Sequence, residues 1–506
     1  MSIDPRADSV DGVVRRSAAR SPDRVALRFE DRIWTYREFD DAVSRGARWL
    51  QAKGLRTGDR VAAFGVNSDA YVLAFLACSR AGLVHVPINY ALKGDELAYL
   101  VGNAQARAVL VDPALAGVLD GADTPALEQT LPLRDGAGSF LEACRADNDA
   151  QSGDQVEYAE LAQLLYTSGT TSKPKGAMMS HSGLVAEYVS SLLALDLTPQ
   201  DNPLICMPLY HSAGMHVFML PYLSIGATIH LMAAPDIPEI LRRVEEDRIG
   251  SLFLAPTVWV PLANHPDLET RDLSSLTKAQ YGASIMPVTV LNRLRAKYPE
   301  LAFYNCFGQS EIGPLATVLR PEDHEARPSS CGKAVFFVET RVVDAAGNDV
   351  PDGTAGEVLY RSPQLCRGYW EDEEASAEAF RDGWFHSGDL VTRDAQGYIT
   401  VVDRIKDVIN TGGVLVASRE VEDVIYLHPA VAEVAVIGTP DDRWIEAVTA
   451  VVVLKANAAG PTEQELIAFV KEKIAPFKVP KSVVFVDELP RNQSGKLLKR
   501  ELRARA

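Results

Sequence analysis

The sequence holds few cysteines, and none of them pair by spacing. Its six cysteines are scattered over 506 residues without a C-x-x-C motif: Cys78, Cys144, Cys206, Cys306, Cys331 and Cys366. This absence argues against a disulfide framework and against a zinc site. Long apolar runs are also missing: nowhere do about 18 apolar residues follow one another, and the segment before Arg24 has no apolar core of the signal-peptide kind. We therefore expect a cytoplasmic protein with no membrane span.

Positive charge is in short supply. The chain has 51 Lys and Arg against 68 Asp and Glu, a net charge of −17, and a field of this sign repels nucleic acid and anionic lipid. We expect no nucleic-acid partner. The shortage is uneven, because residues 471–506 carry a net charge of +6 and residues 1–470 carry −23. A solvated, lysine-rich terminal helix is the ordinary explanation of such a tail.

Internal repeats are absent too, and the composition of 47% hydrophobic and 24% charged residues is that of a globular chain. From Arg24 the pattern predicts a strand, a short turn and an amphipathic helix that ends at Gly54. Apolar strands then alternate with helical stretches of about 10 to 15 residues, and this alternation returns over residues 203–255 and 276–307. It predicts parallel α/β sheets with both faces covered.

After about residue 330 the pattern changes to short strands separated by turn dipeptides such as D-G and Q-G, which predicts a mainly antiparallel β subdomain over residues 330–404. Residues 405–506 combine strands with two amphipathic helices, over residues 418–428 and 461–475, in a unit of about 100 residues. The predicted fold class is α/β. A large N-terminal domain, residues 1–404, holds the parallel α/β sheets and the β subdomain, and a small α+β C-terminal domain, residues 405–506, follows.

The segment with the clearest chemistry is LLYTSGTTSKPKGAMMS, residues 164–180. An apolar strand runs into six residues that are all Ser, Thr or Gly, followed by Lys-Pro-Lys. Hydroxyls, backbone N–H groups and two ammonium groups in one loop suit a polyphosphate. It is not a Walker loop, because Gly169 and Gly176 lie too far apart and no Lys-Ser or Lys-Thr follows. Composition alone also fits a flexible linker, but the strand before the loop and the basic end after it favour phosphate binding.

YTSGTTSKPKG resembles the signature of the acyl-adenylate-forming superfamily, which includes acyl-CoA synthetases, peptide-synthetase adenylation domains and beetle luciferases. Further segments resemble the family's motifs in the same order, from about Arg24 to Arg500. They are MPLYHSAG at 207–214, YGAS at 281–284, NCFGQSE at 305–311, WFHSGDL at 384–390, VDRIKDVINTGG at 402–413 and PRNQSGKLLK at 490–499.

The resemblance implies two half-reactions in one enzyme. A carboxylate attacks the α-phosphate of ATP to give acyl-AMP and pyrophosphate, with Mg²⁺ as the metal, and the thiol of coenzyme A then forms acyl-CoA and releases AMP. Between these steps the C-terminal domain rotates about a hinge at Lys406. Lys496 is the implied mobile catalytic lysine, because an ammonium between two reacting anions stabilises the charge of an in-line displacement.

The resemblance also assigns the other site residues. The implied catalytic residues beside Lys496 are His211, Glu311 and Arg404, and the implied metal ligands are Thr167 and Glu311, whose oxygens suit Mg²⁺. The implied ATP- and AMP-binding residues are Thr167, Ser168, Gly169, Thr170, Thr171, Lys173, Lys175, Gly282, Ala283, Ser284, Asn305, Cys306, Phe307, Gly308, Gln309, Ser310, Asp389, Arg404 and Lys496. The implied acyl-pocket residues are His211, Met215, Phe218, Val258, Trp259, Tyr281 and Gly282.

The sequence departs from the family's pattern where coenzyme A is expected. Relatives carry G-G-E-N-x-x-P after the hinge, whereas Val414 and Leu415 follow the two glycines here and no Pro comes after them. Ile445 stands where D-x-x-W-G-E has Gly, and the lost Pro and Gly change the freedom of the backbone. The implied coenzyme A contacts are Gly412, Gly413, Trp444, Phe477 and Lys478.

These departures leave three functions open: an acyl-CoA synthetase, a ligase that passes the acyl group to a carrier protein or partner enzyme, and a degenerate nucleotide-binding regulator. The presence of Lys175, Glu311, Asp389, Arg404 and Lys496 speaks against the last. A homodimer also stays open. The implied pocket holds no Lys or Arg, and amino-acid-activating relatives carry an Asp near the position of His211, so we expect an apolar carboxylic acid as the small-molecule substrate.

Overall fold

The computed structural model describes residues 9–124, 127–146, 160–167, 173–284, 286–412, 414–441, 443–455, 460–491 and 497–505. The chain divides into two compact units, one of residues 1–340 with 360–385 and one of residues 341–359 with 386–506. The boundary expected between residues 404 and 405 stays a prediction. Within the described ranges, no helix combines the length and the apolar character that a membrane crossing needs.

The first sheet of the larger unit has six strands in the order β6-β5-β3-β4-β7-β8. Every neighbouring pair is parallel except β7 and β8, which form an antiparallel pair at the edge. The prediction of parallel strands is confirmed here. The strands are β3 (Arg60–Phe64), β4 (Val84–Ile88), β5 (Ala106–Val111), β6 (Gln129–Pro132), β7 (Leu161–Thr167) and β8 (Lys175–Ser180).

The second sheet of this unit has nine strands in the order β15-β14-β13-β12-β11-β9-β10-β1-β2. Its centre, from β13 to β1, is parallel, and the two edges are antiparallel. The strands are β1 (Val25–Phe29), β2 (Arg32–Thr35), β9 (Pro203–Ile205), β10 (Ile229–Leu231), β11 (Ser251–Leu254), β12 (Lys278–Gly282), β13 (Ala302–Phe307), β14 (Thr317–Leu319) and β15 (Lys333–Ala334).

The start of this sheet corrects one sequence expectation. The single strand predicted after Arg24 is a hairpin of β1 and β2, and the left-handed backbone of Glu30, with φ of 51°, makes the turn. Glu is an unusual residue for that conformation, so the turn carried no sequence signal. The predicted amphipathic helix is α2. It begins at Tyr36, directly after the N-cap residue Thr35, and Thr35 and Glu38 form a capping box at this end.

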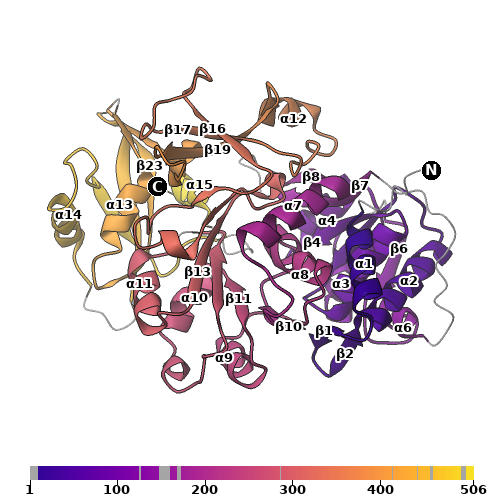
Figure 1. Cartoon of the computed structure of the whole chain (residues 1–506). Helices are drawn as coiled ribbons and strands as arrows, with labels where there is room; N and C mark the ends of the chain where they lie inside the picture. Colours follow the sequence, from indigo (N-terminus) through magenta and orange to yellow (C-terminus); the bar gives the residue numbers. More distant parts are fainter. Residues whose placement is uncertain are drawn as a thin grey trace. The chain divides into compact units, whose positions relative to one another are not determined.

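Helices flank both sheets of the larger unit, as Figure 1 shows for α2, α3 and α4 beside the six-stranded sheet. The helices are α1 (Val10–Arg20), α2 (Tyr36–Ala52), α3 (Asp69–Arg80), α4 (Gly94–Asn103), η2 (Pro113–Leu115), α5 (Ala116–Asp120), α6 (Phe140–Arg145), α7 (His181–Ala194), η3 (Ala213–Met219), α8 (Leu220–Ser224), α9 (Ile237–Glu246), α10 (Pro256–Ala263), η4 (Pro266–Glu269), α11 (Val288–Lys297), η5 (Ser310–Ile312) and η6 (Pro321–Asp323).

The predicted β subdomain is present as a five-stranded sheet in the order β16-β17-β19-β18, with β20 paired to β19. Its strands are β16 (Glu339–Val343), β17 (Gly356–Arg361), β18 (Phe380–Arg381), β19 (Trp384–Arg393) and β20 (Ile399–Arg404). The described pairings β18–β19 and β19–β20 are antiparallel. One helix that the sequence analysis did not anticipate, α12 (Glu373–Ala379), interrupts these strands and is capped by Asp372.

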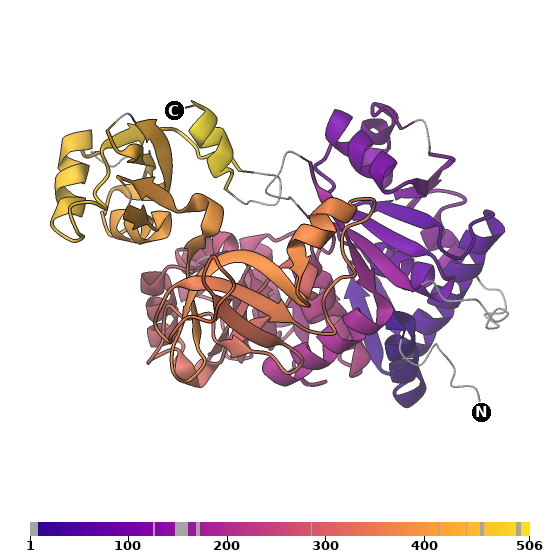
Figure 2. The ribbon, with the colours of Figure 1, turned by 90° about the horizontal axis from the view of Figure 1, so that it is seen from above.

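The C-terminal residues form an α+β unit, drawn in gold and yellow in Figure 2. Its sheet has the order β22-β21-β24-β23, with β25 parallel to β24. Both predicted helices are confirmed, with shorter bounds than expected. The elements are η7 (Ile405–Asp407), β21 (Ile409–Thr411), β22 (Val414–Val416), α13 (Ser418–Ile425), β23 (Val431–Asp441), β24 (Ile445–Leu454), α14 (Glu463–Lys471), β25 (Ser482–Phe485) and α15 (Lys499–Arg505).

Candidate active site

The predicted phosphate loop joins the antiparallel strands β7 and β8. Thr167, the last residue of β7, lies opposite Lys175, the first residue of β8. Ser168, Gly169, Thr170 and Thr171, which the resemblance assigns to phosphate, lie outside the described residues. Because the two strands are in register at the base of the loop, Thr167 and Lys175 are fixed at its two ends.

Helix α4 holds both arms of this hairpin. On the first arm, the hydroxyl of Tyr166 donates to Asn103 Oδ1 at 2.6 Å. On the second arm, the hydroxyl of Tyr99 donates to the carbonyl of Pro174 at 3.1 Å, and Lys173 Nζ lies 5.0 Å from the centroid of the Tyr99 ring. A cation at this distance from a ring is attracted to its face, so the lysine arm is anchored at its backbone and its side chain.

Glu311 lies beside the base of the hairpin. Thr167 Oγ1 donates to Glu311 Oε1 at 3.2 Å, and the hydroxyl of Tyr369 donates to the same oxygen at 3.1 Å. Lys175 Nζ lies 5.2 Å from the centroid of the Tyr369 ring. Glu311 is buried, with 9% of its surface exposed. The structure therefore brings together Thr167, Lys175 and Glu311, which come from segments about 140 residues apart.

The sequence analysis missed Tyr369, which contacts two of these residues. Burial, and secondarily the charge of Glu311, raises the pKa of Tyr369 well above its ordinary value. The phenol therefore keeps its proton and remains a donor to the carboxylate. Its only sequence signal was an aromatic pair, Tyr369 and Trp370, in a polar stretch that ends in acidic residues.

The donor set at this point fits Mg²⁺. A carboxylate and a hydroxyl are the hard oxygen ligands that Mg²⁺ takes from proteins, and it usually completes its shell with water and substrate phosphate. Glu311 and Thr167 supply those two groups within hydrogen-bond distance of each other. Lys173 and Lys175 lie on the second arm of the same hairpin, so the negative charge of a polyphosphate would meet two cations there.

The segments predicted to bind adenine stand at the carboxyl ends of the parallel strands β12 and β13, the edge where ligands bind in open α/β sheets. Gly282 pairs with Cys306, and a Cβ on Gly282 would lie 2.2 Å from the carbonyl oxygen of Cys306, so only glycine fits. Ala283, directly after it, adopts the left-handed region with φ of 64° and is exposed, as is Ser284. Strain of this kind in a non-glycine residue gathers at ligand sites.

Phe307 ends β13, and Gly308 follows it toward η5, where Ser310 meets the predicted acyl-gating segment. Ser310 Oγ lies 3.1 Å from Ser212 Oγ. Asn305 in β13 donates from Nδ2 to the carbonyl of Ser330 at 3.0 Å, so its amide braces the strand end. Gln309, like the other residues of this turn, stays a predicted nucleotide contact.

His211 lies next to Ser212 and beside an aromatic ring. Its ring centroid is 4.4 Å from that of Tyr210. Burial lowers the pKa of His211 to about 4, so the imidazole is neutral at physiological pH. A neutral ring presents no charge that would attract a second carboxylate on the substrate.

Met215 and Phe218 lie on η3, a stretch of π-helix, a form found often at functional sites. Both side chains are buried, and the Phe218 ring stacks on Phe253 with centroids 4.5 Å apart. Tyr281 is also buried, and its hydroxyl donates to His324 Nε2 at 3.0 Å, because Nδ1 of that ring bonds to the carbonyl of Arg320. Val258, partly buried, packs against the apolar core.

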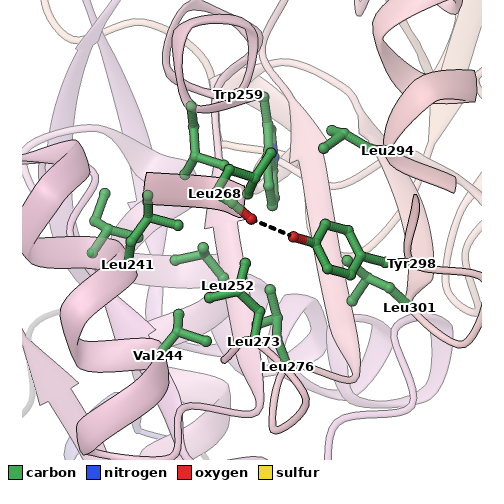
Figure 3. Close-up of a pocket in the computed structure, with 12 residues that line it drawn as sticks. Leu241, Val244, Leu252, Trp259, Leu268, Leu273, Leu276, Leu294, Tyr298 and Leu301 are labelled. Atoms are coloured by element: carbon green, nitrogen blue, oxygen red, sulfur yellow. Dashed lines mark hydrogen bonds between the residues drawn. The ribbon is translucent and has the colours of Figure 1, made fainter. Parts of the chain in front are cut away.

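Trp259 lines a small apolar cavity in the core rather than an acyl-sized space. The cavity has a volume of about 20 Å³ and lies among α9, α10, α11 and β11. Figure 3 shows Trp259, Leu268 and Tyr298 around it, with the Tyr298 hydroxyl donating to the Leu268 carbonyl at 3.1 Å. Such a volume holds about one water molecule at most, so we interpret it as a packing void.

The other unit carries the predicted ribose-binding pair. Asp389, in β19, is buried, and its Oδ1 lies 2.8 Å from Nε of Arg404, the last residue of β20. The predicted hinge residue Lys406 follows in η7. Burial lowers the pKa of Lys406, although the neighbouring Asp407 opposes this shift. Gly388, directly before Asp389, has φ of 68°, in the left-handed region that favours glycine.

The predicted coenzyme A contacts lie in the C-terminal part of the same unit. The Trp444 ring has Arg443 and Lys481 near it, with cation-to-centroid distances of 4.9 and 5.1 Å. Lys478 Nζ lies 5.6 Å from the centroid of Phe477, which is 40% exposed. Gly412 donates its N–H to the carbonyl of Trp444. Gly413 and the catalytic candidate Lys496 lie outside the described residues.

Ile445, the residue that replaces a glycine of the family's pattern, has φ of 68°. A β-branched side chain in the left-handed region is a genuine outlier. The side chain is 60% exposed, as are Val414 at 45% and Leu415 at 67%. The departure noted in the sequence is therefore also a point of backbone strain.

Comparison with known proteins gives matches over nearly the whole chain. The model of the AMP-binding enzyme family matches residues 14–370, and the model of the AMP-binding enzyme C-terminal domain matches residues 420–496. A feruloyl-CoA synthase of Amycolatopsis sp. is 38% identical over 97% of each chain. An indoleacetate–CoA ligase of Aromatoleum aromaticum is 33% identical over 97% of this chain and 96% of its own.

Solved structures match as well. ATP-bound MatB from Rhodopseudomonas palustris has a TM-score of 0.90 and 32% identity, with 98% of this chain and 99% of that chain covered. An o-succinylbenzoate CoA synthetase from Bacillus subtilis, in complex with its acyl-adenylate intermediate, has a TM-score of 0.86 and 28% identity over 97% of both chains.

Proposed function

This chain belongs to the AMP-binding enzyme family and is an AMP-forming acid–thiol ligase, and we propose that the acid it activates is an apolar monocarboxylate. The reaction consumes ATP and coenzyme A. The carboxylate first displaces pyrophosphate from ATP to give acyl-AMP, and the thiol of coenzyme A then displaces AMP to give the thioester.

The observation that carries the proposed site is the cluster of Thr167, Lys175, Glu311 and Tyr369 at the base of the β7–β8 hairpin. In this proposal Lys173 and Lys175 bind the phosphates, and Thr167 and Glu311 hold Mg²⁺. The metal would neutralise charge on the phosphate oxygens when it is bound. Tyr369 keeps Glu311 oriented, because its protonated hydroxyl donates to the carboxylate.

Two further groups complete the proposed adenylation step. Asp389 accepts hydrogen bonds from the ribose hydroxyls, and its ion pair with Arg404 fixes the orientation of the carboxylate. Lys496 supplies an ammonium that stabilises the negative charge as the acid attacks the α-phosphate. We place the hinge at Lys406, so that a movement of the C-terminal domain withdraws Lys496 before coenzyme A reacts.

The proposed substrate class rests on the charge of the acyl-pocket candidates. Met215, Phe218 and Tyr281 are buried and carry no formal charge, and burial keeps His211 neutral. An apolar monocarboxylate would meet such a lining without an unpaired charge, whereas a dicarboxylate or an amino acid would bury one at a high energetic cost. The names of two relatives, feruloyl-CoA synthase and indoleacetate–CoA ligase, extend the candidates to aromatic acids.

A panel of carboxylic acids tests this proposal. Purified protein would be assayed for acid-dependent ATP–pyrophosphate exchange and for AMP release, each with and without coenzyme A. The panel would include hydroxycinnamates, arylacetates, medium-chain fatty acids, malonate and a set of amino acids. We expect AMP release that needs coenzyme A and occurs with apolar monocarboxylates. Turnover confined to malonate or amino acids would refute the substrate class.

A second candidate, transfer to a carrier protein, has one observation in its favour. Val414, Leu415 and Ile445 are exposed apolar residues where the family's pattern has other residues, and one relative is a fatty acid–[acyl-carrier-protein] ligase of Streptomyces coeruleorubidus, 32% identical over 96% of this chain and 94% of its own. This candidate would be favoured over the first if the protein catalysed ATP–pyrophosphate exchange and acylated an added phosphopantetheinyl carrier protein, but showed no AMP release that depends on coenzyme A.

A further inference from the structure

A buried carboxylate and a buried amide meet in the larger unit, outside the site described above. Glu187 lies on α7 and Gln364 follows β17, and both side chains are fully buried. The Gln364 amide donates from Nε2 to Glu187 Oε2. A carboxylate withdrawn from water is costly unless it is well bonded, so this arrangement needs a structural or functional reason.

The pair bonds to the segment that follows Glu311. Gln364 Nε2 also donates to the carbonyls of Ile312 and Leu315, each at 3.2 Å. Glu187 Oε1 accepts from the backbone N–H of Leu315 at 3.3 Å. Three backbone groups within four residues of Glu311 are thus held by two side chains.

The same stretch of chain as Gln364 touches Glu311 itself. The N–H of Cys366 donates to the carbonyl of Glu311 at 2.8 Å, and the Tyr369 hydroxyl bonds to its carboxylate. Residues 364–369 therefore contact Glu311 itself and two of the residues that follow it, Ile312 and Leu315. Gln364 is in turn anchored to α7, because Ser190 Oγ donates to its Oε1 at 2.6 Å.

The chemistry of the pair suits a structural brace, by which we mean the hydrogen bonds that join Glu187 and Gln364 to residues 312–315. Three groups donate to the oxygens of Glu187 in the described part of the chain: the Gln364 amide, the N–H of Leu315 and Ser191 Oγ, which lies 3.1 Å from Oε1. Burial raises the pKa of Glu187 well above its ordinary value, and the hydrogen bonds from Ser191 and from the N–H of Leu315 oppose this shift. Gly313 lies between the bonded residues, with φ of 104°, and a Cβ there would come 3.0 Å from Glu187 Oε2. The loop is shaped to the carboxylate.

We propose that Glu187 and Gln364 are positioning residues that hold the Glu311 segment, residues 311–315, in the geometry required to bind Mg²⁺ with ATP. This inference rests on the proposed role of Glu311. In this proposal neither residue binds the substrate or the metal. Their action is indirect: they fix the backbone on which the metal-binding carboxylate is mounted.

The test compares the affinity for ATP, measured by titration calorimetry on the full chain, with Mg²⁺ and with EDTA. The ratio of the two dissociation constants reports the contribution of the metal site without any turnover. Two variants break the brace. In Glu187→Gln an NH2 group, which only donates, replaces one of the two oxygens that accept hydrogen bonds, and in Gln364→Met the carbonyls of Ile312 and Leu315 lose their donor. Each should reduce the Mg²⁺-dependent gain in affinity about 10-fold, which corresponds to the loss of about one buried hydrogen bond.

Two milder variants complete the series. Ser190→Ala removes only the anchor of Gln364 and should reduce the gain about 3-fold. Ser191→Ala is the matched control: it removes a hydrogen bond to the same carboxylate from within α7 and should leave the gain unchanged. Circular dichroism would verify folding, and if the two stronger variants do not fold, Ser190→Ala against Ser191→Ala decides the question.

Glu311→Gln separates the inference from the function on which it rests. If Glu311→Gln keeps the full Mg²⁺-dependent gain, the proposed metal role is wrong. If Glu311→Gln loses the gain while the folded brace variants keep it, the metal role stands and the positioning role is refuted. A loss in Ser191→Ala equal to that in Ser190→Ala would also refute it, because removing any hydrogen bond near Glu187 would then have the same effect.

Discussion

Lowering the pH should destabilise the larger unit through its buried neutral histidines, of which His216 and His85 have the lowest pKa values, about 3. His216 on η3 and His85 on β4 are both fully buried. Gln163 of β7 joins them: His216 Nε2 lies 3.0 Å from Gln163 Oε1, and Gln163 Nε2 lies 3.2 Å from His85 Nδ1. The Tyr188 hydroxyl lies 3.1 Å from the remaining nitrogen of His216.

These contacts fix the tautomers. Gln163 donates through its amide nitrogen, so Nδ1 of His85 accepts and carries no proton. Nε2 of His216 donates to the amide oxygen, so Nδ1 of His216 accepts from Tyr188. Burial lowers the pKa of each histidine to about 3, whereas an unfolded chain gives about 6.5. The folded state therefore favours the neutral rings, and its stability is full above about pH 6.5 and is lost as the pH falls from there toward 3.

The size of the effect follows from this difference. At about pH 5.5, one unit below the unfolded pKa, the unfolded chain gains about 1.4 kcal/mol from each histidine that only it protonates. His216 and His85 together should lower the free energy of unfolding by about 3 kcal/mol between about pH 7.5 and 5.5. That is a large part of the 5–15 kcal/mol typical of a folded protein.

Urea unfolding followed by circular dichroism at the two pH values measures this loss. The variant His216→Gln should show a pH-dependent loss smaller than that of the wild type by about 1.4 kcal/mol. Tyr188→Phe is the matched control: it removes a hydrogen bond from the same chain but no group that titrates in this range, so its loss should match the wild type. If His216→Gln keeps the full wild-type difference, the reasoning fails.

Two further predictions concern the smaller unit. Ile445→Gly should raise the free energy of unfolding of this unit by about 1 kcal/mol, because a left-handed non-glycine residue costs roughly 1–2 kcal/mol and the exposed side chain contributes little. Thermal unfolding measures this gain, and Ile445→Ala, which keeps a Cβ, should gain less stability. A glycine variant that is less stable than the wild type would contradict the claim that Ile445 is strained. Asp389→Asn should raise the KM for ATP about 10-fold while the KM for the acid stays unchanged, because the neutral amide loses the charge-assisted bonds. Initial-rate kinetics measure both constants, and Asp349→Asn, an exposed site in the same unit, is the control. An unchanged KM for ATP in Asp389→Asn would exclude the ribose role.

The fold class was predictable because its periodic signals are strong. The alternation of apolar strands and helices predicted the parallel sheets, and the turn dipeptides after residue 330 predicted the antiparallel sheet. The hairpin of β1 and β2 was missed because Glu30, not glycine, takes the left-handed turn. Asp372 and the two glutamates that follow it are helix-start signals. Helix α12 was nevertheless missed, because the turn dipeptides on both sides led us to predict only strands between residues 330 and 404.

The site was predictable only in part. Resemblance supplied Thr167, Lys175 and Glu311, and the structure brings these three together. Tyr369, Glu187 and Gln364 could not be found in this way, because their roles depend on contacts between residues up to 177 positions apart. The sequence does not distinguish Glu187 from any other glutamate on a helix, because its role depends on donors that come from Leu315, Ser191 and Gln364 in the folded chain.

The central claim is that one chain runs adenylation and thioester formation with different residues, and Lys496→Ala tests it most directly. Two rates would be measured on this variant and on the wild type: acid-dependent ATP–pyrophosphate exchange, and acyl-CoA formation from added acyl-AMP and coenzyme A. The account predicts that the variant loses at least 100-fold in exchange, an estimate of order ~3 kcal/mol for one charged group in the transition state, and keeps the second rate within about two-fold. Equal loss of both rates would contradict it.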